Sequence, residues 1–284
     1  MKYESNIIPD VGVYEGVPAQ TYFSWRAVNH STLKEIDRSP AHFRFAQFAG
    51  NDDTEAKLFG TVTHAALLEP ARFRESMVLG PINPRTDKAF GVGTNAWNDF
   101  ADANPGKIVV SEDLIERLGT IIHNLEANAD AMALLTGPGK NELTMVWDDP
   151  VTGLRCKGRI DRYRADFGRI DIKTAVTANP NEFSRKGVLT YGYHTQDDWY
   201  RRGVEVLGLG KSNGVLVVVE NESPHLNIIV EWCEETCKLA RIHNLERLMK
   251  VKECVDRGEW PGYPAGINTL SAPTFAFQGF GMGV

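Results

Sequence analysis

Cysteine is scarce in this sequence of 284 residues, which contains only four, at positions 156, 233, 237 and 254. Four scattered cysteines do not predict a disulfide framework, so we expect a reducing, cytoplasmic compartment. Long apolar runs are also missing, and none reaches the roughly eighteen residues that a membrane span needs. The first residues have neither a basic start nor an apolar core, so we expect no signal peptide.

Positive charge is in short supply, since 31 Lys and Arg against 37 Asp and Glu give a formal net charge of −6. Taken alone, this balance argues against a nucleic-acid partner. The distribution is uneven, however, because residues 157–202 contain ten Lys and Arg and six Asp and Glu, a local charge of +4. The basic segment is therefore a candidate surface for a phosphate backbone. The alternative is a strand face that carries Arg for solubility.

Two short strands with a tight turn are predicted at the start of the stretch 158–200. Residues 159–163 and 169–173 alternate polar and apolar side chains. Between them, Ala165-Asp166-Phe167-Gly168 supplies the polar residue and the glycine that a hairpin turn favours.

Acidic and basic side chains are expected to share one face of this hairpin. Side chains alternate faces along a strand, so Asp171 and Lys173 point together, and Asp161 on the partner strand can face the same side. Repulsion between the carboxylates makes such a cluster costly unless a cation lies between them. Hard oxygen ligands favour Mg²⁺ or Mn²⁺ over zinc. The alternative for these residues alone is a solvated strand face.

A helix is expected to follow, with Gln196 and Tyr200 four residues apart on one side. An Asp on one strand, Asp-x-Lys on the next and Gln-x-x-x-Tyr on a helix resembles the PD-(D/E)xK nuclease superfamily. The fuller pattern GRID…DIKT…F…YGYHTQ…WY resembles its phage and prophage exonuclease VIII (RecE-type) branch. The resemblance implies that Asp161 and Asp171 hold metal, that Lys173 orients or activates the attacking water, and that the helix residues support the site. Asp171 stands where many members carry Glu.

An upstream segment carries a second part of this resemblance. Residues 59–70 are similar to the family's Gly-x-x-x-His-x-x-x-Leu-Glu-Pro pattern, which makes His64 a metal-site residue. His64 could instead contact a water or the scissile phosphate, because imidazole is a poorer ligand for Mg²⁺ than for Mn²⁺. Glu69 matches the same segment, and ligation and helix termination both remain open for it. Glu142 could reach the metal face, but we expect it at an exposed strand end.

The predicted fold class is α/β, with a PD-(D/E)xK core in which helices flank a central mixed β-sheet, and with an N-terminal helical extension. We expect an extended, loosely packed segment at 1–29, a single nuclease domain at 30–270 with its core motif at 158–200, and a C-terminal tail at 271–284. Helices are expected at 32–36, 40–48, 55–68, 112–133, 195–209 and 234–256. Strands are expected at 142–147, 154–161, 214–220 and 227–232, and 80–106 as a long, partly mobile segment.

The resemblance further implies an Mg²⁺-dependent exonuclease that acts 5′→3′ on double-stranded DNA ends and makes single strands for phage-type recombination. It implies a ring-shaped homo-oligomer and a single-strand annealing protein as partner. An iron–sulfur cluster, which some relatives hold, is not expected from the cysteine spacing. The basic side chains expected to contact DNA are Arg159, Arg162, Arg185, Lys186 and Arg201. The alternatives are an endonuclease on the same core and a DNA-binding protein with a degenerate site.

Overall fold

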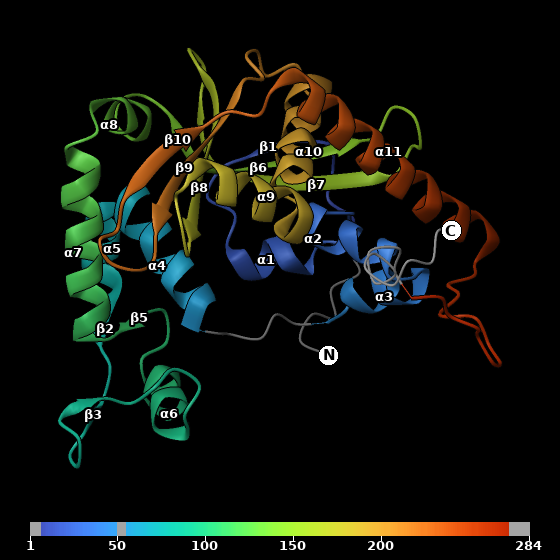
Figure 1. Cartoon of the computed structure of the whole chain (residues 1–284). Coiled ribbons are helices and arrows are strands. Elements are labelled where there is room, and N and C mark those ends of the chain that lie inside the picture. The colour runs from blue at the N-terminus through green and yellow to red at the C-terminus, as the bar shows by residue number, and fades with distance from the viewer. Residues whose placement is uncertain (1–6, 50–54, 273–284) are drawn as a thin grey trace, which may run out of the picture.

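A six-stranded mixed sheet forms the centre of the molecule (Figure 1) in this computed structural model, which describes residues 7–49 and 55–272. Its strands, in spatial order, are β1 (Gly12–Tyr14), β6 (Lys140–Asp148), β7 (Arg155–Arg164), β8 (Gly168–Ala175), β9 (Gly214–Glu220) and β10 (Asn227–Val230). Neighbours are antiparallel except β8 and β9, which are parallel because a helical crossover connects them. The strands expected at 142–147, 154–161, 214–220 and 227–232 are present, β6, β7 and β8 as an antiparallel meander and β9 and β10 as an antiparallel pair.

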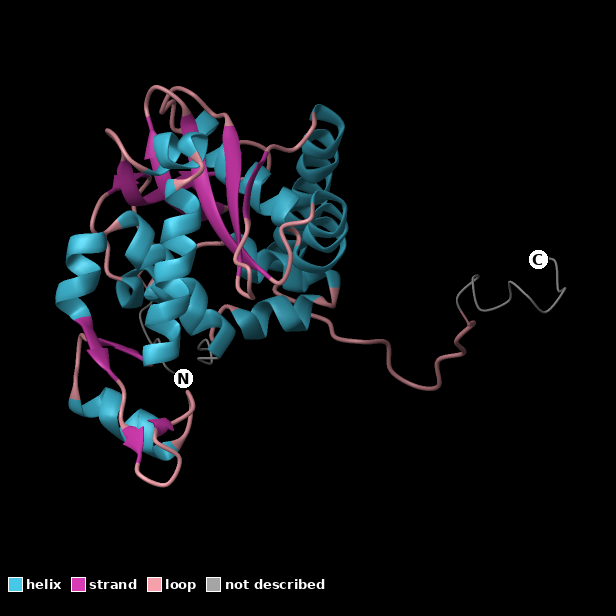
Figure 2. Cartoon of the chain, turned by 60° about the vertical axis from the view of Figure 1, so that its left-hand side comes forward, coloured by secondary structure: helices cyan, strands magenta, loops and turns pink. Residues whose placement is uncertain are grey.

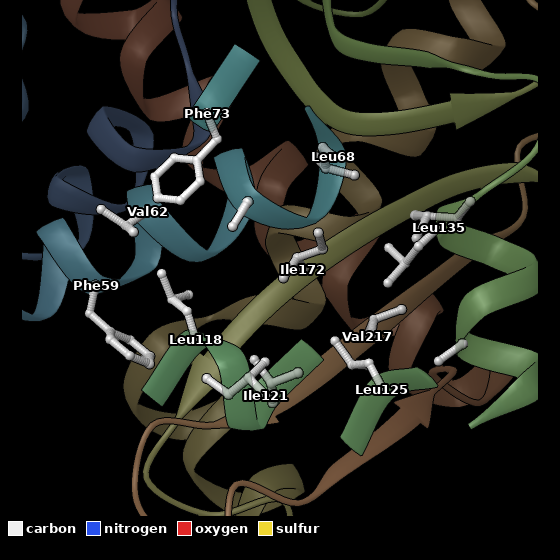
Figure 3. Packing of buried hydrophobic residues seen from close by; sticks show 14 of the residues in the cluster. Phe59, Val62, Leu68, Phe73, Leu118, Ile121, Leu125, Leu135, Ile172 and Val217 are labelled. Atoms are coloured by element: carbon white, nitrogen blue, oxygen red, sulfur yellow. The ribbon is translucent and has the colours of Figure 1, made fainter. Parts of the chain in front are cut away.

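One face of the sheet is covered by α4 (Glu55–Leu68), α5 (Pro70–Ser76), α7 (Glu112–Glu126) and α8 (Ala129–Leu135). Figure 3 shows how Ile172 and Val217 of the sheet pack against Ile121 and Leu125 of α7. Burying these branched side chains stabilises the fold by about 1.5–3 kcal/mol for each one. The helix expected at 112–133 is divided in two, because the Asn128 side chain accepts a hydrogen bond from the Ala131 N–H and so caps α8.

The other face carries two groups of helices. Near the N-terminus lie α2 (His30–Leu33), the 3₁₀-helix η1 (Lys34–Asp37) and α3 (Pro40–Ala46), and later in the chain α9 (Pro180–Lys186), the π-helix η2 (Gly187–Tyr191), α10 (Tyr193–Val206) and α11 (Glu234–Arg257). Trp147 and Trp199 meet at the centre of this second core, with ring centroids 5.2 Å apart. Ser39 and Pro40 begin α3 as predicted, whereas Asn29 caps α2, which starts two residues before the expected helix.

The segment before residue 30 differs from the expected extended, loosely packed one. Strand β1 pairs with β6 and forms an edge of the sheet, and residues Ala19–Ser24 form helix α1. The reason is a buried amino group, because the Lys157 Nζ donates to the carbonyls of Tyr22 (2.6 Å) and Trp25 (2.8 Å) at the end of α1. The helix is thereby fastened to β7. Residues 273–284 of the expected C-terminal tail lie outside the described residues.

A small lobe projects from the body between α5 and α7 (Figures 1 and 2). Its base is the parallel pair β2 (Met77–Leu79) and β5 (Ile108–Val110), and it contains β3 (Ile82–Asn83), β4 (Lys88–Ala89) and α6 (Asn95–Ala103). The region expected to be long and partly mobile is therefore structured, and the Thr94 side chain caps α6. Among the described helices, none combines the length and apolarity that a membrane crossing requires.

Candidate active site

The strands β7 and β8 separate at the point where the predicted acids begin. Their ladder runs only from Arg164↔Gly168 to Arg162↔Ile170. At the next position the Asp161 carboxylate accepts a hydrogen bond from the Ile172 N–H (2.8 Å), in the place where a backbone carbonyl would stand in a regular ladder. The separation opens room for functional side chains at the centre of the sheet.

A second irregularity brings Glu142 to the same place. The β6–β7 register pairs Asn141 with Arg162 and Leu143 with Ile160, which sets Glu142 opposite Asp161. Glu142 has a φ of 51°, a left-handed conformation that is uncommon for a residue with a side chain. Such conformations cluster at functional sites.

His64 of α4 completes a group of three with these acids. His64, Glu142 and Asp161 each offer a ligand atom, and the three atoms lie within 4.8 Å of one another. The His64 Nε2 lies 2.9 Å from the Ile172 carbonyl, which can only accept, so Nε2 carries the hydrogen. In the neutral ring Nδ1 then presents its lone pair to Asp161 Oδ2, 3.4 Å away. Two acceptors that face each other favour a cation between them.

Asp171 and Lys173 form an ion pair beside this group. Asp171 Oδ1 is buried and has no hydrogen-bond partner in the described part of the chain. Burial and the Asp161 charge raise the pKa of Asp171 to about 6. Burial lowers the pKa of Lys173, but Asp171 and Asp161 outweigh it and the net pKa is raised, so Lys173 carries its charge at neutral pH.

Glu142 is the site residue that the sequence reasoning placed wrongly. It was expected at an exposed strand end, yet it is half-buried within the ligand group. Burial and Asp161 raise its pKa to about 7, and Arg159, 3.7 Å away, opposes this only in part. The pairing of the two predicted strands could have identified it, because continuing that antiparallel register to residue 142 sets Glu142 across from Asp161.

Three carboxylates and one imidazole fit a hard divalent cation. Oxygen donors dominate the group, which suits Mg²⁺ and Mn²⁺, and the imidazole favours Mn²⁺ of the two. Asp171 lies next to the three-residue group rather than in it, with a free buried oxygen. We therefore retain Asp171 as a candidate ligand and add Glu142 to the predicted His64 and Asp161.

The helical pair Gln196 and Tyr200 borders the same space. The Gln196 Nε2 donates to the Tyr200 hydroxyl at 3.2 Å, and both residues line a pocket of about 670 Å³ together with His64, Glu142 and Asp161. Burial and the Asp171 charge raise the pKa of Tyr200, so its hydroxyl stays protonated. Gly158 of β7 lies beneath the ring, where a Cβ atom would come within 3.0 Å of Tyr200.

Glu69 also lines this pocket. It stands at the N-cap of α5, makes no capping bond with its side chain, and forms a 3.1 Å ion pair with Arg72. The structure thus places Glu69 at a helix junction, on the wall of the pocket rather than in the ligand group.

The basic residues predicted to contact DNA divide into two classes. Arg159 lines the pocket, Arg185 is exposed on α9, and Lys186 beside it is half-buried. Arg162 was wrongly predicted to contact DNA, because it is only 4% exposed and donates to the carbonyls of Leu134, Thr136 and Gly137 at the C-terminal end of α8. Arg201 of α10 points toward α11, and its guanidinium donates hydrogen bonds to Asp197 and Cys237.

Comparison with known proteins yields one family and a similar fold. The family described as a PDDEXK-like domain of unknown function (DUF3799) matches residues 29–273. A crystal structure of a candidate exonuclease from Eubacterium rectale superposes with a TM-score of 0.57 at 13% identity, over 95% of this chain and 100% of that chain. The protein SSO0001 covers 77% of this chain and 84% of its own at 12% identity, and its TM-score of 0.28 is too low to bear on the fold. No curated protein matches the sequence significantly.

The family match spans every pocket residue described above, from His64 to Tyr200. The superposition supports the predicted fold class, and the PDDEXK-like family match confirms the predicted superfamily. The RecE-type branch stays a prediction. The chain belongs to the PDDEXK-like family DUF3799, a membership that supports nuclease activity in general.

Proposed function

We propose that this protein is a metal-dependent deoxyribonuclease that degrades double-stranded DNA from its ends, in the 5′→3′ direction. The observation that carries the proposal is the convergence of His64, Glu142 and Asp161 in one pocket, with the Asp171–Lys173 pair beside them. The residues come from α4, β6, β7 and β8, and a purely structural role would not require three acidic groups at one point of the sheet.

A divalent cation is the first requirement of this function. His64, Glu142 and Asp161 would hold Mg²⁺ or Mn²⁺, and Asp171 has the unpaired oxygen to join them. When bound, the cation polarises the phosphate and lowers the pKa of water. It would also relieve the repulsion from Asp161, which adds to the effect of burial in raising the pKa values of Glu142 and Asp171.

Lys173 is the residue that we assign to the reacting centre. Its ammonium is charged, only 12% exposed and held by Asp171, so it offers a fixed positive charge next to the ligand group. Such a charge can hold the attacking water or stabilise negative charge that develops on the phosphate. Gln196 and Tyr200 supply polar groups in the same pocket as the ligand group, where they can orient a phosphate or a water.

The DNA would approach past Arg159 in the pocket and Arg185 and Lys186 on α9. The resemblance to the RecE-type branch supports duplex ends as substrate, a ring-shaped homo-oligomer and a single-strand annealing partner in recombination. These remain parts of the proposal, together with a phage origin and a cytoplasmic location.

The test compares linear duplex DNA with covalently closed circular DNA in the presence of Mg²⁺ or Mn²⁺. We expect loss of the linear form only, and a 5′ label should be released before a 3′ label. Lys173→Ala should lower the rate about 10²–10³-fold, the usual effect of removing one charge-stabilising group. Cleavage of the circle would replace the exonuclease by an endonuclease on the same site.

A matched control separates catalysis from folding. Lys252→Ala removes a lysine of α11 that pairs with Asp256, outside the ligand group and the proposed DNA path, and should keep most of the activity. If wild type cleaves neither substrate with either metal while it still binds duplex DNA, the nuclease proposal is wrong and a DNA-binding role replaces it.

A further inference from the structure

Three aromatic rings form a stack that leads outward from the candidate active site. The rings of Phe183 and Tyr193 are stacked with centroids 5.7 Å apart and planes 25° from parallel. Tyr193 and Tyr191 continue the stack at 5.2 Å and 21°. Phe183 is buried, Tyr193 is half-buried and Tyr191 is 45% exposed, so the stack begins in the core and ends at the surface.

The backbone is specially shaped to build this stack. Residues two apart on an α-helix do not face each other, so Tyr191 and Tyr193 could not stack within one regular helix. Here the π-helix η2 ends at Tyr191, Gly192 takes a φ of 70°, and α10 begins at Tyr193. A Cβ atom at position 192 would lie 3.1 Å from Thr195 Oγ1, in a conformation that side chains rarely adopt. π-Helical turns are frequent at functional sites.

The stack adjoins the reacting centre and follows a helical turn that carries positive charge. The Lys173 Nζ is 5.1 Å from the centroid of the Tyr193 ring. Helix α9, which runs directly into η2, carries Arg185 and Lys186 in its last turn. This arrangement suits a nucleic-acid strand. The exposed ring can stack on a base, and the basic side chains can bind phosphates.

We propose that Tyr191 is a stacking platform for an unpaired base of a single DNA strand next to the cleaved bond. Phe183 and Tyr193 hold the Tyr191 ring in place, and its outer face takes the base. This inference rests on the proposed nuclease function and adds the single-stranded part of its substrate. A base in a duplex already has two stacking neighbours, so the platform favours a frayed or unpaired end.

The experiment measures binding without cleavage, so that it does not depend on turnover. A fluorescently labelled single-stranded oligonucleotide is titrated with wild type, Tyr191→Ala, Tyr191→Phe and Leu189→Ala in Ca²⁺, and Kd is taken from anisotropy. Leu189 is 79% exposed on the same π-helix and serves as the matched control. We expect a roughly 5- to 150-fold weaker Kd for Tyr191→Ala, the range of one base–aromatic stack, and wild-type binding for the other two variants.

A second arm identifies the contact itself. An abasic site is moved along the oligonucleotide one nucleotide at a time. At one position it should weaken wild type as much as Tyr191→Ala does, and the two changes together should cost no more than either alone.

Equal binding by wild type and Tyr191→Ala would overturn the inference. So would a loss that is the same for every abasic strand, because that result would point to a change in folding or to a protein partner for Tyr191. Neither outcome touches the cleavage test with linear DNA, so a failure here is distinct from a failure of the nuclease function.

Discussion

Glu142 and Asp161 are two like charges that face each other across a β-ladder, an arrangement that is normally avoided. Both are held close to His64, and the pKa of Glu142 is raised to about 7 chiefly by burial and by Asp161. The pKa of Asp171 is raised to about 6 by the same two causes. The carboxylates of the site therefore repel one another, and a bound cation would remove that repulsion.

Metal binding should therefore depend on pH. Protons compete with the cation for Glu142 and Asp171, and both groups lose their protons as the pH rises through about 6 to 7. We expect the Mn²⁺ affinity, measured by calorimetry, to rise between pH 6 and pH 8. Glu142→Gln should bind more weakly at pH 8 and show a shallower rise. An affinity that is flat across this range in wild type would contradict the assigned ligands.

Helix α10 is the element that brings Gln196 and Tyr200 to the pocket, and buried polar contacts anchor it. Arg169 of β8 donates to the Asp197 carboxylate at 2.6 Å and to its backbone carbonyl at 2.7 Å. From α11, the Asn244 amide donates to the Thr195 carbonyl and to Asp198. Gly214 lies so close to the Arg169–Asp197 pair that a Cβ atom there would come within 2.4 Å of both side chains. The orientation of α10 is thus set by the sheet and by α11 together.

Asp197→Ala should destabilise the protein strongly. The change leaves the Arg169 guanidinium, 2% exposed, without its carboxylate partner, and breaking a buried pair in this way costs about 3–5 kcal/mol. The free energy of unfolding from urea titration measures the effect. Glu253→Ala, which removes an exposed i,i+4 pair with Arg257, is the control and should change little. Similar losses in the two variants would show that the buried pair is not an anchor.

For the molecule as a whole, the local charge of residues 157–202 overstates the basic surface that is available to DNA. Residues 157–202 carry a local charge of +4, yet four of their basic residues are at most 9% exposed and are bound inside the protein: Lys157, Arg162, Arg169 and Arg202. These side chains fasten helices to the sheet. The basic side chains that remain from those predicted to contact DNA are Arg159, which lines the pocket, and Arg185 and Lys186, which lie on α9.

Metal should stabilise the entire fold, because the ligand group joins elements from distant parts of the chain. His64 lies on α4 on one side of the sheet, and Glu142 and Asp161 lie on central strands. Binding to the folded state alone adds about 2.7 kcal/mol at a metal concentration of 100 Kd. We expect Mn²⁺ at pH 8 to raise Tm by roughly 5 °C in calorimetry. Asp161→Asn should lose most of this shift, and an unchanged shift would contradict the site.

Local patterns in the sequence were sufficient for much of the fold. Alternation along β8 predicted that Ile170 and Ile172 enter one core while Asp171 and Lys173 point away, and both isoleucines do lie in that core. The helix expected from residue 40 begins at Pro40 as α3, and the strand expected at 214–220 is β9. These features depend on neighbours along the chain or on a fixed periodicity, which is why they can be read without the structure.

The superfamily could be predicted from the sequence alone, because Asp161, Asp171, Lys173, Gln196 and Tyr200 follow the spacing of a recognisable nuclease pattern, and the family match confirms that superfamily. Only the tertiary structure decided that Glu142 joins His64 and Asp161, since that depends on the register between strands. It also decided that Arg162 is an internal donor and that Tyr191 stacks on Tyr193. Burial, strand separation and a left-handed glycine are set by the packing of distant segments, and composition and spacing carry no record of that packing.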